Sequence, residues 1–170
     1  IASVIAALKY TIGENAYGYS GLGDVFVFLF FGLLSVLGSY YLLDHQMVWD
    51  LLLPASTIGF LSMAVLNLNN MRDIKNDAKN NKNTLVVSLG SSKAKIYHYV
   101  LICLAVLLTL LYSIINDHSI RQLIYVIAFL PLIINLVTVY KNKEPKLLDS
   151  ELKKVALSTF SFALLFGFFH

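Results

Sequence analysis

Long, uninterrupted apolar blocks are the feature that most limits how this sequence can fold. A helix needs about 20 apolar residues to cross a bilayer, and five blocks come close to or reach that length. In lipid only helices and closed barrels satisfy the backbone, and the blocks lack the strict alternation of barrel strands. The predicted spans are Val25–Leu43, Met47–Leu66, Tyr97–Ile115, Ile120–Tyr140 and Val155–Phe169.

The chain begins inside a further apolar run, Ile1–Leu8, with no methionine before it. We therefore predict an all-α, polytopic transmembrane helical bundle with five whole spans plus one partial span. Residues 1–170 form one transmembrane domain whose N-terminal part is missing. Pro54 and Pro131 fall inside spans, where proline predicts kinks.

Basic residues predict the orientation of these spans. Six Lys or Arg residues lie in segment 67–96 and five in segment 141–154, whereas the turns at 44–46 and 116–119 have none. Counting crossings puts both basic segments on one side, together with Lys9–Asp24. Because basic loops stay in the cytoplasm, we expect the long polar segments, including a loop over 67–96, to face it.

Composition agrees with a membrane protein. Hydrophobic residues make up 58% of the chain and charged residues only 14%, against roughly half and a quarter in soluble domains. The lipid bilayer is therefore an expected partner. The net charge of +3 is small, and no Lys/Arg-dense face with interleaved aromatics suggests a nucleic-acid partner.

The stretch Asn67–Lys82 carries most of the chemically informative residues. It follows an apolar span directly, so we expect it to continue that helix out of the membrane. On a helix Asn70, Asp73 and Asp77 share one face, because they are spaced i, i+3 and i+7, and Asn69 joins them. Carboxylates one turn apart repel each other, so a cation is expected between them.

Magnesium suits this arrangement, since it takes oxygen ligands from one or two carboxylates and from substrate phosphates. Arg72 and Lys82 could then contact phosphate oxygens. The alternative is an ordinary solvated basic segment in which Asp73 and Asp77 pair with lysines. Asn80–Asn81 also has a structural interpretation as a helix C-cap, because Asn tolerates the left-handed conformation.

Two motifs resemble the UbiA-type membrane prenyltransferases, and in particular the branch that prenylates 1,4-dihydroxy-2-naphthoate in menaquinone synthesis. The first resembles the family's second aspartate-rich motif and the second its loop between helices four and five. The first reads Asn69-Asn70-Met71-Arg72-Asp73 with Asp77, then Lys82, Thr84-Leu85, Val87 and Leu89-Gly90. The second reads Lys9-Tyr10-Thr11, Gly13, Tyr17-Gly18-Tyr19, Gly21-Leu22-Gly23-Asp24 and Phe30-Phe31-Gly32.

This resemblance implies a Mg²⁺-dependent transferase of the bacterial inner (cytoplasmic) membrane, with its active site facing the cytoplasm. It would move a polyprenyl group from polyprenyl diphosphate to the naphthoate with decarboxylation, giving demethylmenaquinone. The implied roles are metal binding by Asp73 and Asp77, catalysis by these two and Lys82, and substrate binding by Asn69, Asn70, Arg72, Lys9, Tyr10 and Asp24.

Several alternatives stay open. Asp24 could instead cap the helix beginning at Val25. Asn81 stands where the branch usually has glycine, and Ser88 where a basic residue is frequent. The family's first aspartate-rich motif is not in this sequence, so the chain alone is expected to be inactive. The alternative functions are prenylation of another aromatic acceptor, such as 4-hydroxybenzoate, and a non-enzymatic helical membrane protein.

Overall fold

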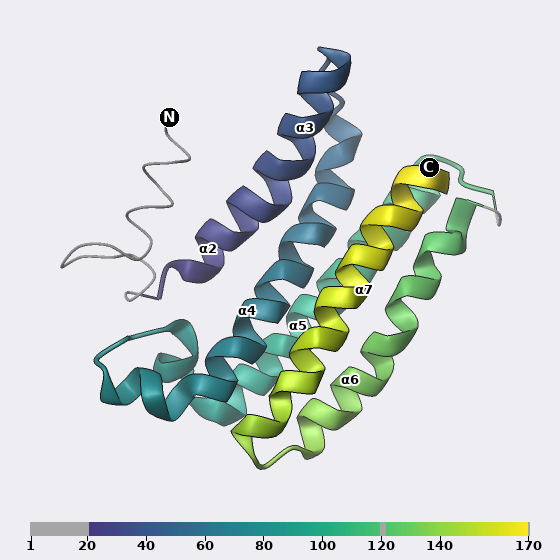
Figure 1. Ribbon diagram of the computed structural model, residues 1–170. Coiled ribbons are helices and arrows are strands. Elements are labelled where there is room, and N and C mark those ends of the chain that lie inside the picture. The colour runs from purple at the N-terminus through teal and green to yellow at the C-terminus, as the bar shows by residue number, and fades with distance from the viewer. Residues whose placement is uncertain (1–20, 120–121, 170) are drawn as a thin grey trace.

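The computed structural model of the protein describes residues 21–119 and 122–169. Every regular element in these ranges is a helix, and five helical segments are long and apolar enough to cross a membrane. They lie side by side in one bundle (Figure 1). The predicted all-α bundle with five whole spans is therefore confirmed, whereas the partial span at Ile1–Leu8 lies outside the described residues. The five segments are Gly23–Asp44, Trp49–Lys79, Leu85–Ile115, Gln122–Lys141 and Pro145–Phe169.

Four of these segments change helix type along their length. The first contains α2 (Gly23–Val27), a π-helical stretch (Phe28–Leu34) and α3 (Ser35–Asp44); the second a 3₁₀ turn (Trp49–Leu51) and α4 (Leu52–Lys79); the third α5 (Leu85–Ile115); the fourth a 3₁₀ stretch (Gln122–Phe129) and α6 (Leu130–Lys141); the fifth a 3₁₀ turn (Pro145–Leu147) and α7 (Leu148–Phe169).

The two prolines inside spans mark junctions between helix types. Pro54 and Pro131 each lie in the first turn of an α-helix, α4 or α6, directly after a 3₁₀ stretch. Proline has no N–H to donate, and the first turn is where that loss costs least. The predicted disturbance of these spans therefore takes the form of a change of helix type near the helix start.

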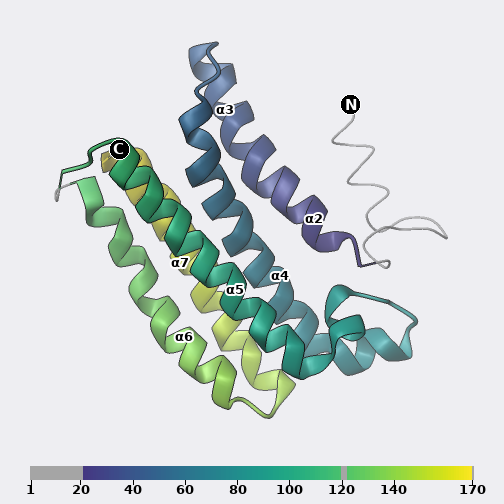
Figure 2. The same cartoon turned by 180° about the vertical axis from the view of Figure 1, so that it is seen from behind.

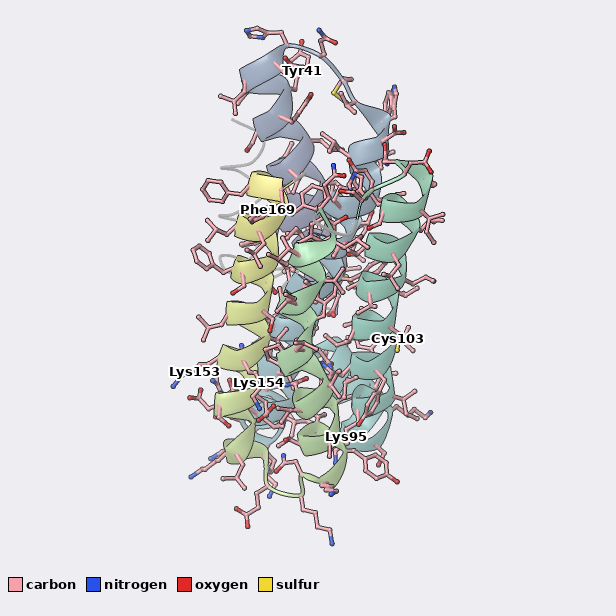
Figure 3. All side chains as sticks on the ribbon, turned by 90° about the vertical axis from the view of Figure 1, so that its right-hand side faces the viewer. Tyr41, Lys95, Cys103, Lys153, Lys154 and Phe169 are labelled. Atoms are coloured by element: carbon pink, nitrogen blue, oxygen red, sulfur yellow. The ribbon has the colours of Figure 1, made fainter. Side chains whose placement is uncertain are left out.

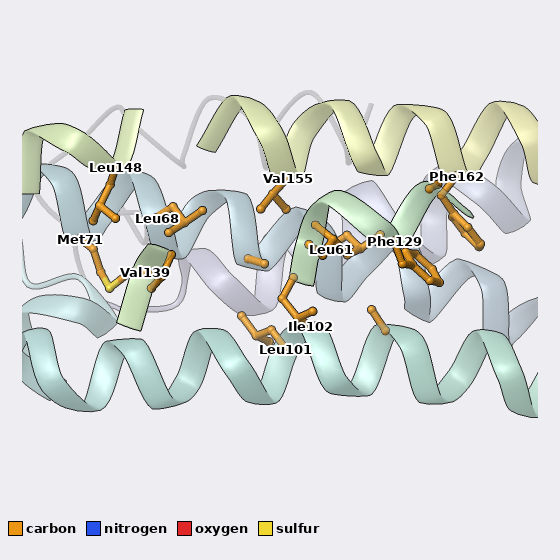
Figure 4. Packing of buried hydrophobic residues seen from close by; sticks show 14 of the residues in the cluster. Leu61, Leu68, Met71, Leu101, Ile102, Phe129, Val139, Leu148, Val155 and Phe162 are labelled. Atoms are coloured by element: carbon orange, nitrogen blue, oxygen red, sulfur yellow. The ribbon is translucent and has the colours of Figure 1, made fainter. Parts of the chain in front are cut away.

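Helix α4 is the centre of the bundle. It packs against α5, against α7 and against the π-helical stretch of the first segment, as the views from front and back show (Figures 1 and 2). The core between these helices is a continuous apolar cluster that includes Leu61, Leu101 and Phe162 (Figure 4). Large apolar side chains also cover the outside, where Leu43 is 86% exposed and Phe168 76%, as expected for a surface in contact with lipid.

The first segment crosses α4 at very short range. A Cβ atom on Gly32 would lie 2.7 Å from the Gly59 Cα, and one on Gly59 would lie 2.6 Å from the Phe28 ring. Small residues permit such close contact, and helices in membranes associate through it because lipid provides no hydrophobic drive between them. The pair therefore fixes how α2 and its π-helical continuation lie on α4.

The basic segments meet at one end of the bundle. Figure 3 shows Lys95, Lys153 and Lys154 near that end and Tyr41 at the opposite one. The Lys95 ammonium also donates to the backbone carbonyl of Tyr140, 3.1 Å away. The prediction that both basic segments lie on the same side is confirmed, and their cytoplasmic location stays a prediction.

The loop expected over residues 67–96 is wrong, because most of that segment is helical. Helix α4 continues to Lys79, as its polar continuation predicted, and α5 begins already at Leu85. The side chain of Thr84 accepts a hydrogen bond from the Val87 N–H at 3.2 Å and so caps α5. Gly90, with φ of 75°, then breaks the helix before the membrane span.

Candidate functional site

The turn that ends α4 brings Lys82 back to Asp77. Asn81 has a φ of 56°, and its N–H donates to the Ala78 carbonyl at 3.3 Å. The Lys82 N–H donates to the Asp77 carbonyl at 2.9 Å. These two bonds define a Schellman motif with Asn in the left-handed position that glycine usually occupies. The structure thus confirms that Asn81 can supply the turn.

The same turn pairs the two side chains. The Lys82 Nζ lies 3.4 Å from each carboxylate oxygen of Asp77. The Asp77 side chain is only 7% exposed and that of Lys82 30%. A buried carboxylate requires a nearby cation, and Lys82 is such a cation in this structure.

Asp73 has a different cationic neighbour, Arg72. The Arg72 Nε donates to one Asp73 oxygen at 3.0 Å and Nη2 donates to the other at 2.8 Å. The same Nη2 donates to the Asn69 side-chain oxygen at 2.5 Å. The cation expected between the two aspartates is therefore replaced by two separate ion pairs. The alternative of pairing with lysine holds for Asp77 and is wrong for Asp73.

A small polar pocket of about 190 Å³ lies between the start of α2, α4 and the α4–α5 turn. It joins four of the predicted site residues, which come from segments far apart in the sequence. Two glycines at the start of the first segment form part of its wall. Its lining residues are Gly21, Gly23, Asp24, Leu66, Asn69, Asn70, Lys82, Thr84 and Leu85.

Asp24 is buried in this pocket and accepts a hydrogen bond from the Tyr97 hydroxyl at 3.0 Å. The alternative in which Asp24 caps the following helix is wrong. The helix already begins at Gly23, and Leu22 is its N-cap residue, with no side-chain cap bond. Sequence reasoning missed Tyr97, because it falls at the predicted start of a span, where an aromatic residue is unremarkable.

Arg72 and Asp73 line a second polar pocket, of about 590 Å³, between α4 and the α6–α7 connection. There the Arg72 Nη1 donates to the Asp149 carboxylate at 3.0 Å. Sequence reasoning also missed Asp149; the available signal was an acid in the basic segment 141–154, which shares this end of the bundle. Two other predicted residues, Lys9 and Tyr10, lie outside the described ranges.

An apolar pocket of about 460 Å³ adjoins the small polar pocket. The two pockets share Leu66 and Asn69 on α4. The apolar one extends between the first segment and α7, so it follows the membrane-spanning part of the bundle. It is lined by Val27, Phe31, Ser62, Val65, Leu66, Asn69, Leu152, Ala156 and Thr159.

The donor atoms of this region suit a hard cation. Asp73 and Asp77 supply carboxylate oxygens, and Asn69 and Asn70 supply amide oxygens, from one face of α4. Oxygen ligands of this type favour magnesium over zinc, which prefers thiolate and imidazole. Within residues 21–119 and 122–169, no three acidic, His or Cys side chains converge as a complete metal cluster. The residues therefore fit a magnesium ion that also takes oxygens from a bound phosphate group.

Comparison with known proteins gives close relatives. The chain is 40% identical over 167 residues to the 1,4-dihydroxy-2-naphthoate octaprenyltransferase of Haemophilus influenzae, covering 98% of this chain and 54% of the relative. It is 47% identical over 126 residues to the enzyme of that name from Escherichia coli, covering 74% of this chain and 41% of the relative. The chain thus spans about half the length of these curated relatives.

A more distant relative is the UbiA prenyltransferase domain-containing protein 1 of Dictyostelium discoideum. It is 31% identical over 156 residues, which are 92% of this chain and 46% of the relative. No solved structure gives a significant match. Residues 1–167, nearly the whole chain, match the UbiA prenyltransferase family. The chain is thus a multi-pass helical membrane protein that belongs to the UbiA prenyltransferase family.

Proposed function

We propose that the protein containing this chain transfers a polyprenyl group from a polyprenyl diphosphate to 1,4-dihydroxy-2-naphthoate. Relatives that are 40% and 47% identical bear the name of an octaprenyltransferase for this acceptor. The length of the prenyl group on this protein's own donor is left open by the proposal. The cytoplasmic end of the bundle is the proposed location of the reaction.

The observation that carries the proposal is the junction of a polar and an apolar pocket at Asn69 and Leu66. A polyprenyl diphosphate is an amphiphile with a compact, doubly charged head and a long apolar tail. The polar pocket contains Lys82 and the two asparagines, which suits the head. The apolar pocket runs along membrane-spanning residues such as Phe31 and Ala156, which suits the tail.

Each polar residue then has a distinct role. Lys82 binds diphosphate oxygens as a point charge. Asp73 and Asp77 are the proposed ligands of magnesium, and Asn69 and Asn70 orient its remaining ligands. Magnesium, when bound, neutralises the charge that develops on the leaving diphosphate.

The reaction follows from placing these charges in advance. The C–O bond of the donor breaks, and its electron pair leaves with the diphosphate, whose growing charge Lys82 stabilises. The allylic cation is attacked by the acceptor carbon that carries the carboxylate. Loss of CO₂ from this carbon returns the electron pair to the ring, so the product is demethylmenaquinone in its reduced, quinol form. Asp24, held by Tyr97, is proposed to position the acceptor.

The basic end also supports a proposed orientation. Lys82, Lys95, Lys146 and Lys153 belong to the two basic segments, which lie at the same end of the bundle as the pockets. Because basic segments remain on the cytoplasmic side, we propose that the active site opens to the cytoplasm from the bacterial inner membrane.

The test uses the full-length protein in a bacterial strain that lacks its own naphthoate prenyltransferase. Mass spectrometry of extracted quinones should show menaquinone restored by the wild-type gene. Membranes from this strain, given polyprenyl diphosphate and Mg²⁺, should prenylate 1,4-dihydroxy-2-naphthoate. Prenylation of 4-hydroxybenzoate instead would favour the alternative acceptor, and transfer to neither would contradict an enzymatic role.

A further inference from the structure

Arg72 is nearly saturated by contacts within the protein. A guanidinium has five N–H donors, and four of them are used here. Nε and Nη2 hold the two oxygens of Asp73, a second Nη2 hydrogen reaches Asn69, and Nη1 reaches Asp149. At most one N–H remains for a phosphate oxygen, so the main work of this side chain is done on its protein neighbours.

The fork of Arg72 fixes Asp73 without consuming it. An ionised carboxylate offers about four lone-pair positions, and the two parallel N–H···O bonds occupy two. A bidentate pair of this kind sets the plane of the carboxylate as well as its position. Asp73 therefore keeps lone pairs for a cation while its orientation is held by Arg72.

Arg72 in turn is fixed by Asp149 in the first turn of α7. The second oxygen of Asp149 accepts from Lys153, one turn further along α7, at 2.9 Å. The Asp149 side chain is 47% exposed and that of Arg72 29%. An ion pair this exposed contributes only about 0–1 kcal/mol to stability, so its effect on the geometry of Arg72 matters more than its effect on folding.

The first turn of α7 is itself tied into the bundle by a buried polar network. The Asn135 amide on α6 donates to the Glu151 carboxylate at 2.9 Å, and its side-chain oxygen is 2.8 Å from His98 Nε2 on α5. Lys154 donates to Glu151 at 2.7 Å. Glu151 lies two residues after Asp149, so α5 and α6 together fix the place from which Asp149 reaches α4.

We propose that Asp149 is a positioning residue of the candidate site: it holds Arg72, and Arg72 orients the carboxylate of Asp73 toward the cation. The proposal rests on the proposed function for the identity of that cation, a hard divalent ion bound together with diphosphate. Asp149 itself touches neither ligand. Helix α7 thus contributes to the site through an ion pair rather than through a ligand of its own.

The test measures cation binding by the purified full-length protein rather than its activity. Mn²⁺, which prefers the same oxygen ligands as Mg²⁺, is titrated in the presence of inorganic diphosphate and followed by electron paramagnetic resonance. Asp149→Asn should weaken Mn²⁺ binding about 10-fold, the size typical for residues that orient metal ligands. Arg72→Lys, which keeps the charge but loses the fork, should weaken it at least as much.

The double variant distinguishes positioning from independent effects. Because Asp149 acts through Arg72, the Arg72→Lys, Asp149→Asn protein should bind Mn²⁺ no more weakly than Arg72→Lys alone. Asp149→Glu, which keeps the charge, should retain most of the affinity. Glu144→Gln is the matched control, since Glu144 lines the same pocket and the change removes the same charge; it should leave Mn²⁺ binding unchanged.

The outcomes separate this inference from the proposed function. Wild-type affinity in Asp149→Asn, or full additivity in the double variant, overturns the positioning role even if prenyl transfer proceeds. Coupled loss of Mn²⁺ binding in a protein that prenylates no aromatic acceptor supports the positioning role and overturns the proposed function. A wild-type protein that binds no Mn²⁺ overturns both.

Discussion

The two ends of the bundle both contain buried polar side chains, yet they are organised differently. At the end away from the basic segments, the Tyr125 hydroxyl lies 2.8 Å from both Ser113 Oγ and His118 Nδ1. Ser113 also donates to the Thr109 carbonyl at 2.8 Å, so these groups satisfy one another. At the basic end Asn69, Asn70 and Lys82 face a pocket instead.

The difference shows what separates a structural polar cluster from a candidate site. A histidine, a tyrosine and a serine within hydrogen-bonding distance would attract attention as a catalytic set. Here they connect α5 to the segment that leads into α6, and Tyr125 is fully buried. At the basic end, polar atoms share a pocket with apolar walls, and its ion pairs leave carboxylate lone pairs available. Space and unused bonding capacity, more than residue type, distinguish the candidate site.

The strongest test of this comparison is removal of a proposed metal ligand. Asp73→Asn or Asp77→Asn in the full-length protein should lower the rate of prenyl transfer at least about 100-fold, or about 2.7 kcal/mol, because a fixed charge opposite the leaving group is lost. The measurement is Mg²⁺-dependent transfer in isolated membranes. Asp50→Asn, the same change at the other end, should leave the rate within about twofold. Near wild-type rates in both aspartate variants would falsify the metal assignment.

The next largest effect is expected where the first segment crosses α4. Gly32→Ala places a methyl group 2.7 Å from the Gly59 Cα, so backbones must separate, at a cost of about 2 kcal/mol. Unfolding of the purified protein in detergent would measure it. Gly38→Ala is the control, because its nearest neighbour is a flexible Leu34 methyl at 3.7 Å. Equal stability of the two variants would mean that the crossing is looser than described.

A smaller effect is expected from removing the diphosphate contact. Lys82→Met should raise the KM for the polyprenyl diphosphate about tenfold, or about 1.4 kcal/mol, since one cation is lost from the polar pocket. Steady-state kinetics with varied donor concentration would measure it. Lys95→Met removes the same charge from the same end, but Lys95 donates to backbone carbonyls at the end of α6. If both variants raise the KM equally, general charge rather than Lys82 accounts for donor binding.

The smallest effect is expected at the other end. Tyr125→Phe removes the hydroxyl shared by Ser113 and His118 and should reduce stability by about 1 kcal/mol. The same detergent unfolding assay would detect this, while the rate of prenyl transfer should stay unchanged. A large fall in the rate, without loss of stability, would contradict the purely structural interpretation of this cluster.

Local pattern predicted much of the fold, and its errors have clear physical causes. The five spans, the shared end of the basic segments and the continuation of α4 to Lys79 follow from apolar length, charge and helical period. The loop expected over 67–96 was wrong because charged and amide side chains suggested irregular structure. Those side chains are compatible with helices outside lipid, where Thr84 and Asn81 determine the actual boundaries.

The candidate site divides along the same line. Sequence alone placed Asn69, Asn70, Asp73 and Asp77 on one face of a helix, because the 3.6-residue period requires it. It could not show that Asp24 meets Tyr97, 73 residues later.

By itself the sequence determined a helical membrane protein with its polar chemistry at the basic end of the bundle, since lipid and the helical period act on each segment separately. Only the tertiary structure decided that Arg72 joins Asp73 to Asp149, 77 residues away, and that the polar pocket opens onto the apolar one. Such contacts depend on where helices cross and on their relative register. Both are set by packing such as that of Gly32 on Gly59, which no local pattern specifies.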